Sequence, residues 1–258
     1  MKKRQRLRRA LLLVSFLLFP ITINYYSPYL ILQGSMEGVL AGSALLFGGQ
    51  FLFAIFFGRL FCGWLCPAGA LQEACATIVE KPVKKRADIV KYIIWAPWLG
   101  SIIAGFVFAG GVKRVDPLYY TEGGISVNSP EGYIIYFGVI FLLVLLAFTV
   151  GRRGACHSVC WMAPFMVLGG RMGRALCLPA LRMKPEKEKC TSCKACEKAC
   201  PMSLPVSSMA ARGDMKHTEC ILCANCADAC PRHVITMGFQ TASKAATKAA
   251  KQSAAGSR

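Results

Sequence analysis

Eight cysteines in the last third of the chain occur in two runs that share one spacing. Each run follows the pattern Cys-x2-Cys-x2-Cys-x3-Cys-Pro, first over residues 190–201 and again over residues 220–231. Three closely spaced thiolates can wrap three corners of an iron–sulfur cube while the backbone turns its N–H groups toward the sulfur atoms. The proline then directs the chain away from the site. The repeated pattern predicts two [4Fe–4S] clusters.

The spacing also predicts which cysteines bind each cluster. In proteins with two such runs, the fourth cysteine of one run ligates the cluster of the other run. Cluster one is expected to use Cys190, Cys193, Cys196 and Cys230, and cluster two Cys220, Cys223, Cys226 and Cys200. Zinc or disulfides are the alternatives, but zinc motifs rarely use two complete four-cysteine runs with this offset and proline. Two adjacent clusters suit the relay of single electrons.

Four further cysteines form two Cys-x3-Cys pairs, each shortly after a Gly-Arg dipeptide. The first pair is Cys62 and Cys66, and the second, 94 residues later, is Cys156 and Cys160. This similarity predicts a duplicated hairpin with both copies in the same orientation. If each pair lies on one face of a helix, the four thiolates form a site for copper(I), zinc or an iron–sulfur cluster. The alternative is that they are small apolar residues that pack in a helical bundle.

The remaining candidates carry weaker signals. His157 lies between the cysteines of the second pair, where it can bind a metal or exchange a proton with a quinone; a solvated interfacial histidine is the alternative. Cys75 and Cys177 lack partners at ligand spacing and are interpreted as packing residues. Motifs for haem, flavin, NAD and ATP are absent from the sequence, so we expect a partner to carry out any substrate chemistry.

Four apolar segments can position these cysteines at a membrane. Hydrophobic residues make up 55% of the chain and charged residues 17%, which is unusual for a soluble domain. The apolar segments are residues 10–32, 38–57, 92–112 and 132–150, each about long enough to cross a bilayer as a helix. Pro20 and Pro97 are expected to kink the first and third segments. The predicted fold is mostly α: a four-helix transmembrane bundle of two repeated hairpins, then a small ferredoxin-like domain with two [4Fe–4S] clusters.

The lysine and arginine counts predict the orientation of these segments. Residues 1–9 carry six basic residues, and the connection after the second segment carries Arg59, Lys81, Lys84, Lys85, Arg86 and Lys91. The outer loops carry only Lys113 and Arg114, a bias of 12 to 2. Such a bias predicts a multi-pass protein of the cytoplasmic (inner) membrane with both termini in the cytoplasm. A cleaved signal peptide over residues 1–25 is the alternative, but no convincing small-residue cleavage site follows it.

The net charge of +18 lies largely beside apolar segments, where it meets anionic lipid. No nucleic-acid-binding motif accompanies it, so membrane lipid is the expected partner and nucleic acid is not. The predicted boundaries are a membrane domain over 1–160, an interfacial linker over 161–185, the ferredoxin-like domain over 186–238 and a mobile basic tail over 239–258. Glycines and arginines interrupt residues 161–183, which favours a helix along the inner surface over a fifth span.

These motifs resemble those of the NapH/NosR/CcoG group of membrane polyferredoxins. The resemblance covers nearly the whole chain and rests on FCGWLCP at 61–67, CHSVC at 156–160 and the paired cysteine runs. By length and four-span layout, the chain is most similar to the NapH-type quinol dehydrogenase component. The family usually has Cys-x3-Cys-Pro in both copies, but here the second proline is delayed to Pro164.

The resemblance implies electron transfer between a membrane quinone pool and a partner oxidoreductase. The first functional prediction is therefore a membrane-bound electron relay whose partners are a quinone and a redox protein. The alternatives are a copper or metal reductase or maturation factor that uses the membrane cysteines, and a redox sensor.

Overall fold

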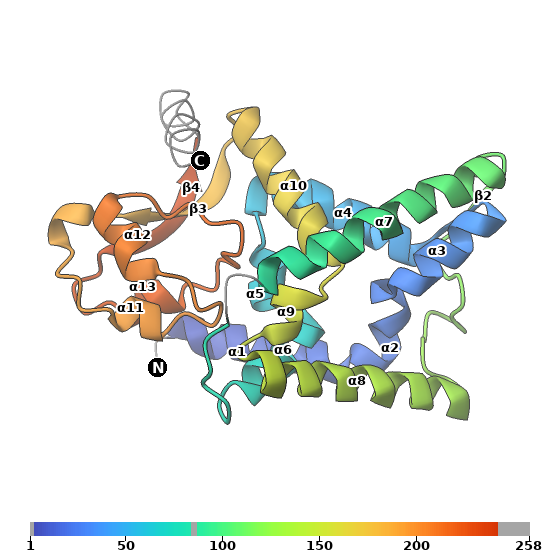
Figure 1. The fold of residues 1–258 in the computed structure, drawn as a ribbon, viewed down its shortest axis with the longest axis horizontal. Coiled ribbons are helices and arrows are strands. Elements are labelled where there is room, and N and C mark those ends of the chain that lie inside the picture. The colour runs from blue at the N-terminus through green and yellow to red at the C-terminus, as the bar shows by residue number, and fades with distance from the viewer. Residues whose placement is uncertain (1–2, 84–86, 242–258) are drawn as a thin grey trace. The chain divides into compact units, whose positions relative to one another are not determined.

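The structure is a computed structural model that describes residues 3–83 and 87–241 and is mostly helical (Figure 1). Lys2, Lys84, Lys85, Arg86 and all but the first residues of the predicted tail over 239–258 lie outside the described residues. The chain divides into two compact units. The first unit contains residues 1–50 and 64–164, and the second contains residues 51–63 and the chain from residue 165 onward.

The first unit is built from helices with one short pair of strands. Its elements are α1 (Lys3–Leu17), α2 (Phe19–Thr22), the 3-10 helix η1 (Ile23–Tyr26), α3 (Pro28–Glu37), β1 (Val39–Ala41), α4 (Gly42–Phe57), α6 (Pro67–Cys75), α7 (Ala87–Phe108), β2 (Arg114–Asp116), α8 (Pro130–Val150) and α9 (Gly154–Ser158). The last residues of α4 belong to the second unit. Strands β1 and β2 pair in parallel, with Val39 opposite Arg114. Helix α1 packs on α6, α3 on α7, and α9 on both α7 and α8.

Two described helices, α7 and α8, are long and apolar enough to cross a membrane, and a third span is obtained if the bent pair α1 and α2–η1 is counted as one. Helix α4 is apolar but has only 16 residues. Its length of about 24 Å is shorter than a hydrocarbon core of about 30 Å. By length and composition, the structure therefore has two to three candidate spans.

The first predicted segment, residues 10–32, is not one helix. Pro20 lies in the first turn of α2, and Pro28 begins α3, where Ser27 caps the helix by accepting a hydrogen bond from the Leu30 N–H at 3.3 Å. The chain bends by 59° between α1 and the α2–η1 segment. Proline lacks the N–H that a continuous helix requires, which explains the breaks. Pro97, by contrast, lies inside the continuous 22-residue helix α7.

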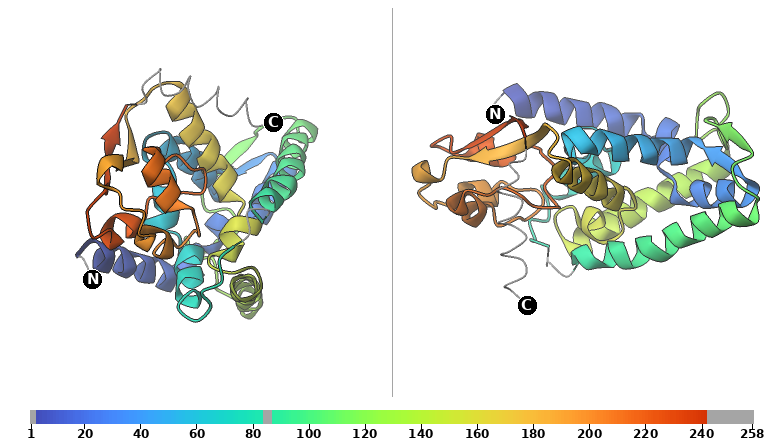
Figure 2. Two further views of the ribbon diagram at one scale, coloured as in Figure 1. Left: turned by 60° about the vertical axis from the view of Figure 1, so that its left-hand side comes forward. Right: turned by 90° about the horizontal axis from the view of Figure 1, so that it is seen from above.

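The second unit combines short helices with a two-stranded antiparallel sheet. Its elements are α5 (Leu60–Trp64), α10 (Met162–Ala175), β3 (Ala180–Pro185), the 3-10 helix η2 (Lys187–Lys189), α11 (Ala195–Lys198), α12 (Val206–Arg212), α13 (Asn225–Ala229) and β4 (Ile235–Gln240). Strand β3 precedes the two cysteine runs in the sequence, and β4 follows them. The two strands lie side by side (Figure 2), with Ala180 opposite Gln240. The region predicted as an interfacial helix over 161–183 is helical only as far as Ala175, because its end pairs with β4.

Candidate iron–sulfur sites

The two cysteine runs have the same backbone conformation. Three pairs of residues, each pair 30 positions apart, have positive φ between 49° and 61°: Ser192 and Leu222, Lys194 and Ala224, and Ser203 and His233. Non-glycine residues in this region each cost of order 1–3 kcal/mol, and such strain clusters at functional sites. The equivalent helices α11 and α13 carry the third cysteine of each run, Cys196 and Cys226. The sequence repeat is therefore also a structural repeat, in which the loops wrap around a site.

Two cavities in this domain separate the eight cysteines into two sets of four. The first cavity is lined by Cys190, Cys193, Cys196 and Cys230, and the second by Cys200, Cys220, Cys223 and Cys226. Their volumes, including the open mouths, are about 360 and 400 Å³. The structure thus brings together the same two sets that the spacing predicts, with the fourth cysteine of each run crossing to the other cavity.

The two cavities differ in their exposure to solvent. Residues 191–194, which form the loop of the first site, are all exposed and include Cys193. Residues 221–224, at the equivalent positions of the second site, are all buried and include Cys223. The first site therefore lies at the surface of the domain and the second in its interior.

The electrostatics of the cysteines fit a cationic iron–sulfur group. Burial, together with the neighbouring thiolate of Cys223, raises the pKa of Cys200 to about 11 and that of Cys220 to about 12. At the first site, burial raises the pKa of Cys196, and Cys230 and Cys190 act in the same direction. Four thiolates this close together repel one another, and a positive metal centre between them would offset that repulsion. Sulfur donors alone favour iron–sulfur clusters, zinc or copper(I) over harder metals.

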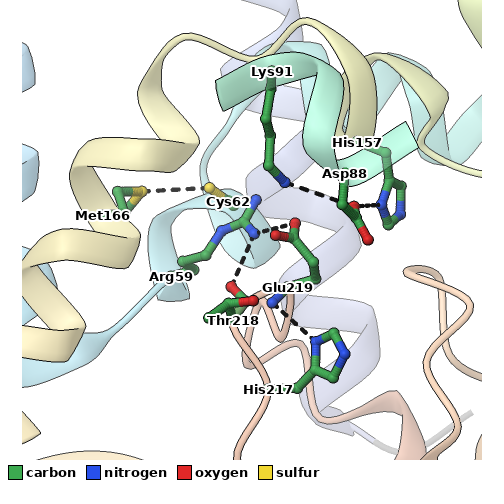
Figure 3. A network of polar contacts seen from close by, with 9 residues as sticks. All are labelled: Arg59, Cys62, Asp88, Lys91, His157, Met166, His217, Thr218 and Glu219. Atoms are coloured by element: carbon green, nitrogen blue, oxygen red, sulfur yellow. Dashed lines mark hydrogen bonds and ion pairs between the residues drawn. The ribbon is translucent and has the colours of Figure 1, made fainter. Parts of the chain in front are cut away.

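A buried ion pair joins the second site to Arg59, just after the end of α4, within the second unit (Figure 3). Arg59 Nη1 donates to Glu219 Oε2 at 2.6 Å and to the carbonyl oxygen of Thr218 at 3.1 Å. The Arg59 and Glu219 side chains are only 3% and 2% exposed. Arg59 was counted among the charges that orient the membrane helices, and its contact with Glu219 was not predicted. The repeated Gly-Arg dipeptide marks this position but does not identify a partner 160 residues away.

The two cysteine pairs have similar local structures, although the second proline is delayed. In the first copy, Gly58 at φ +53° ends α4, Cys62 lies in the five-residue helix α5, and Cys66 lies beyond its end. In the second copy, Gly151 at φ +121° ends α8, and Cys156 lies in the five-residue helix α9. Cys160 lies in the break before α10.

The interpretation that each pair lies on one helical face is wrong, because a helix ends between its two cysteines. Cys66 is extended, with ψ of 119°, and its Sγ accepts a hydrogen bond from the Gly69 N–H as the N-cap of α6. Pro67 follows it, and a residue before proline disfavours the helical conformation. In the second copy, Val159 leaves the helical region at φ −125°.

The structure divides the four membrane cysteines between the two units. Cys62, in the second unit, is buried, and its Sγ lies 3.4 Å from the Met166 Sδ (Figure 3). Cys66, Cys156 and Cys160 belong to the first unit. A metal site shared by all four cysteines therefore stays a prediction. Burial raises the pKa of Cys75, in keeping with its interpretation as a packing residue.

His157 is buried, which contradicts the alternative of a solvated interfacial histidine. Its Nδ1 lies 2.5 Å from Asp88 Oδ1, at the start of α7 (Figure 3). The same carboxylate oxygen lies 3.7 Å from Lys91 Nζ, which is also buried. Lys91 was counted only as an orientation charge, and the contact of Asp88 with His157 was not predicted, because one turn of a long apolar helix gives no sign of a distant histidine.

A second buried network joins three helices of the first unit. Glu73 on α6 pairs with Arg8 on α1 and, at 2.7 Å, with Arg153 at the start of α9. The side chains of Arg8 and Arg153 have no exposed surface. These arginines therefore act as internal partners of a carboxylate, although Arg8 was counted among the charges that orient the apolar segments.

Two protein-family models match the chain. A model described as a 4Fe-4S dicluster domain matches residues 189–235, which include the eight cysteines of the two runs. A model described as a 4Fe-4S binding domain matches residues 40–86, which include Cys62 and Cys66. Together with the two cysteine-lined cavities, these matches define the class: a ferredoxin-type iron–sulfur protein with apolar helices and a C-terminal 4Fe–4S dicluster domain.

Several curated proteins are similar to this chain over two thirds or more of its length. The methylamine utilization ferredoxin-type protein MauN of Methylorubrum extorquens is 30% identical over 67% of this chain and 59% of MauN. The ferredoxin-type protein NapH of Escherichia coli K12 is 24% identical over 86% of this chain and 77% of NapH. The regulatory protein NosR of Stutzerimonas stutzeri is 28% identical over 67% of this chain and 23% of NosR.

The chain is a ferredoxin-type 4Fe–4S membrane protein related to NapH, MauN, NosR and YccM, which confirms the resemblance to NapH and NosR. It spans only 62% and 59% of the length of the first curated relatives it matches, YccM and MauN. No solved structure matches the chain significantly.

Proposed function

We propose that this protein is a membrane-bound electron carrier that relays electrons between the quinone pool and a partner oxidoreductase. The observation that carries the proposal is the pair of four-cysteine cavities in one small domain. A structural metal site has no need of a close second site, whereas a relay of single electrons does. The names of the relatives NapH and MauN, both ferredoxin-type proteins, support the same function.

The cysteines of the two cavities are the proposed cluster ligands. Cys190, Cys193, Cys196 and Cys230 would hold cluster one, and Cys220, Cys223, Cys226 and Cys200 would hold cluster two. A bound [4Fe–4S] cluster supplies one-electron transfer. The thiolates would fix the position of each cluster, and the buried loop over residues 221–224 would exclude water from the second site.

The proposed membrane arrangement has four spans in two hairpins, with both termini in the cytoplasm. Helices α7 and α8, the bent α1–η1 segment and the shorter α4 support it. Among the described residues, three of the basic residues counted for orientation are buried in ion pairs: Arg8, Arg59 and Lys91. Without these three residues, the bias changes from 12 against 2 to 9 against 2. The two outer residues, Lys113 and Arg114, are exposed and stay in the count. The cytoplasmic excess that the rule requires therefore remains.

The exposure of the two sites suggests where the partner protein exchanges electrons. Electron transfer between proteins requires a short path, and the loop of the first site, with Cys193, is exposed. We therefore assign exchange with the partner oxidoreductase to cluster one. Cluster two, whose loop is buried and contacts the end of the first hairpin, is assigned to the quinone side.

Anaerobic purification with iron, acid-labile sulfide and EPR measurements tests the proposal. Two clusters require about eight irons per chain, and a quinol in liposomes should reduce them. The matched controls are Cys75→Ser and Cys177→Ser, which change cysteines outside all proposed sites and should leave the iron content unchanged. A preparation without iron and sulfide would overturn the proposal, and a loaded protein that quinol does not reduce would overturn its quinone half.

Metal handling by the membrane cysteines is a second candidate function. One observation favours it: the Cys62 thiol lies 3.4 Å from the Met166 thioether, and both are soft donors of the kind that selects copper(I). Copper binding by the wild type and by a Cys62→Ser/Cys66→Ser double variant distinguishes the two functions. Loss of bound copper in the double variant would support metal handling, and unchanged copper binding would exclude it.

A further inference from the structure

Arg59 occupies an unusual position for a residue at the end of an apolar helix. It follows Gly58, which ends α4, and its buried guanidinium reaches a segment of chain 160 residues away. There it contacts Thr218 and Glu219, the two residues that precede Cys220. Cys220 is the first cysteine of the second run and lines the second cavity.

The same short segment of chain makes a second close approach to this loop. A side chain at Gly63 would overlap the carbonyl oxygen of Ile221, and it would lie 3.4 Å from the backbone nitrogen of Cys223. The segment from Arg59 to Gly63 therefore contacts the loop on both sides of Cys220. Glycine at position 63 allows the two backbones to meet, and Arg59 fixes the approach by a charged hydrogen bond.

The guanidinium of Arg59 lies beside the second site, because it is hydrogen-bonded to the two residues that precede Cys220. At the first site, the basic residues that line the cavity, Lys194 and Arg232, are exposed, so solvent and salt screen their charges.

We propose that Arg59 is a positioning residue that fixes the loop of cluster two and raises the reduction potential of that cluster through a buried positive charge. Reduction adds one negative charge to a cluster, so a nearby cation stabilises the reduced form. Because the site is buried, water stabilises that charge less there than at the surface, and the Arg59 cation compensates. Glu219 holds the guanidinium in place.

The proposal rests on the assignment of Cys200, Cys220, Cys223 and Cys226 to cluster two, but not on quinol or a partner protein. An EPR-monitored redox titration of the purified chain therefore tests it separately from the proposed electron relay. Cys193→Ser, which alters cluster one alone, identifies the signal of each cluster. The central variant is Arg59→Gln/Glu219→Gln, which removes both charges and leaves no unpaired ion in the interior.

In this double variant, we expect the midpoint potential of cluster two to become more negative and that of cluster one to stay unchanged. Arg59→Lys, which keeps the charge, should restore most of the potential. Arg212→Gln removes an exposed arginine from α12 of the same domain and should change neither potential. Unchanged potentials in the fully loaded double variant, or equal shifts of both clusters, would overturn the proposal.

A measurement on the wild type keeps the proposal testable if the double variant does not fold. Salt screens a buried charge much less than an exposed one. Raising the ionic strength should therefore shift the potential of cluster one and leave that of cluster two nearly constant. If the two potentials respond equally to salt, a buried cation does not set the potential of cluster two.

Discussion

Arg153 Nη2 lies 2.7 Å from Glu73 Oε2, so the start of α9 is joined to the helix that follows the first cysteine pair. The same carboxylate pairs with Arg8 on α1. One glutamate thus connects three helices of the first unit and balances two fully buried arginines. A buried charge without a partner is far more costly than a buried pair, so the network depends on Glu73.

Glu73→Gln should destabilise the first unit strongly, because it removes the carboxylate that pairs with two buried guanidinium groups. We expect a loss of about 3–5 kcal/mol in the free energy of unfolding. Thermal unfolding in detergent, followed by circular dichroism, measures the effect. Glu131→Gln changes an exposed glutamate at the start of α8 and should be nearly neutral. Equal melting temperatures for the two variants would contradict the role given to Glu73.

The same carboxylate should make stability depend on pH. Burial by itself would raise the pKa of Glu73, but the hydrogen bonds and charges of Arg8 and Arg153 outweigh it and lower the pKa from 4.5 to about 2. Because the pKa of Glu73 is lower in the folded state, its carboxylate contributes stability that is present above pH 4.5. This stability is lost as the pH falls toward 2. The difference in melting temperature between wild type and Glu73→Gln should be constant from about pH 7 to 5 and narrow below that. A difference that does not change down to the lowest accessible pH would argue against this linkage.

Gly63→Ala should disturb the second cluster site and spare the first. The added Cβ would overlap the Ile221 carbonyl oxygen and displace the loop that carries Cys220 and Cys223. Iron should fall from about eight toward about four per chain, with loss of one EPR signal.

Gly48→Ala and Gly238→Ala are the matched controls for this substitution, since no atom lies within 4 Å of a Cβ at either position. Both should retain full iron. If Gly63→Ala also retains all its iron and both unaltered EPR signals, the close approach does not position the site.

Air should remove the cluster from the first site before the second. Oxidants reach exposed sulfur ligands first, and the loop with Cys193 is exposed whereas the loop with Cys223 is buried. A time course of EPR signals after brief air exposure, assigned with Cys193→Ser and Cys223→Ser, measures the order of loss. Simultaneous loss of both signals would show that exposure does not govern their stability.

The cysteine spacing by itself determined much of the dicluster domain. Because the runs repeat every 30 residues, the fourth cysteine of each run can reach the other cavity, and the structure groups the cysteines in the predicted sets. The positions of α7 and α8 were also predicted closely, since long apolar runs that end near glycine or proline leave few alternatives.

Only the tertiary structure decided which charges are internal. The contact of Arg59 with Glu219 joins residues 160 positions apart, and that of Arg153 with Glu73 joins residues 80 apart. Sequence periodicity reports local structure and contains no information about such distant partners. The helix break between Cys62 and Cys66 could have been predicted from the sequence, because Pro67 restricts the conformation of the residue before it. The burial of Arg59 could not have been predicted, since its carboxylate partner lies in a segment that only folding brings beside it.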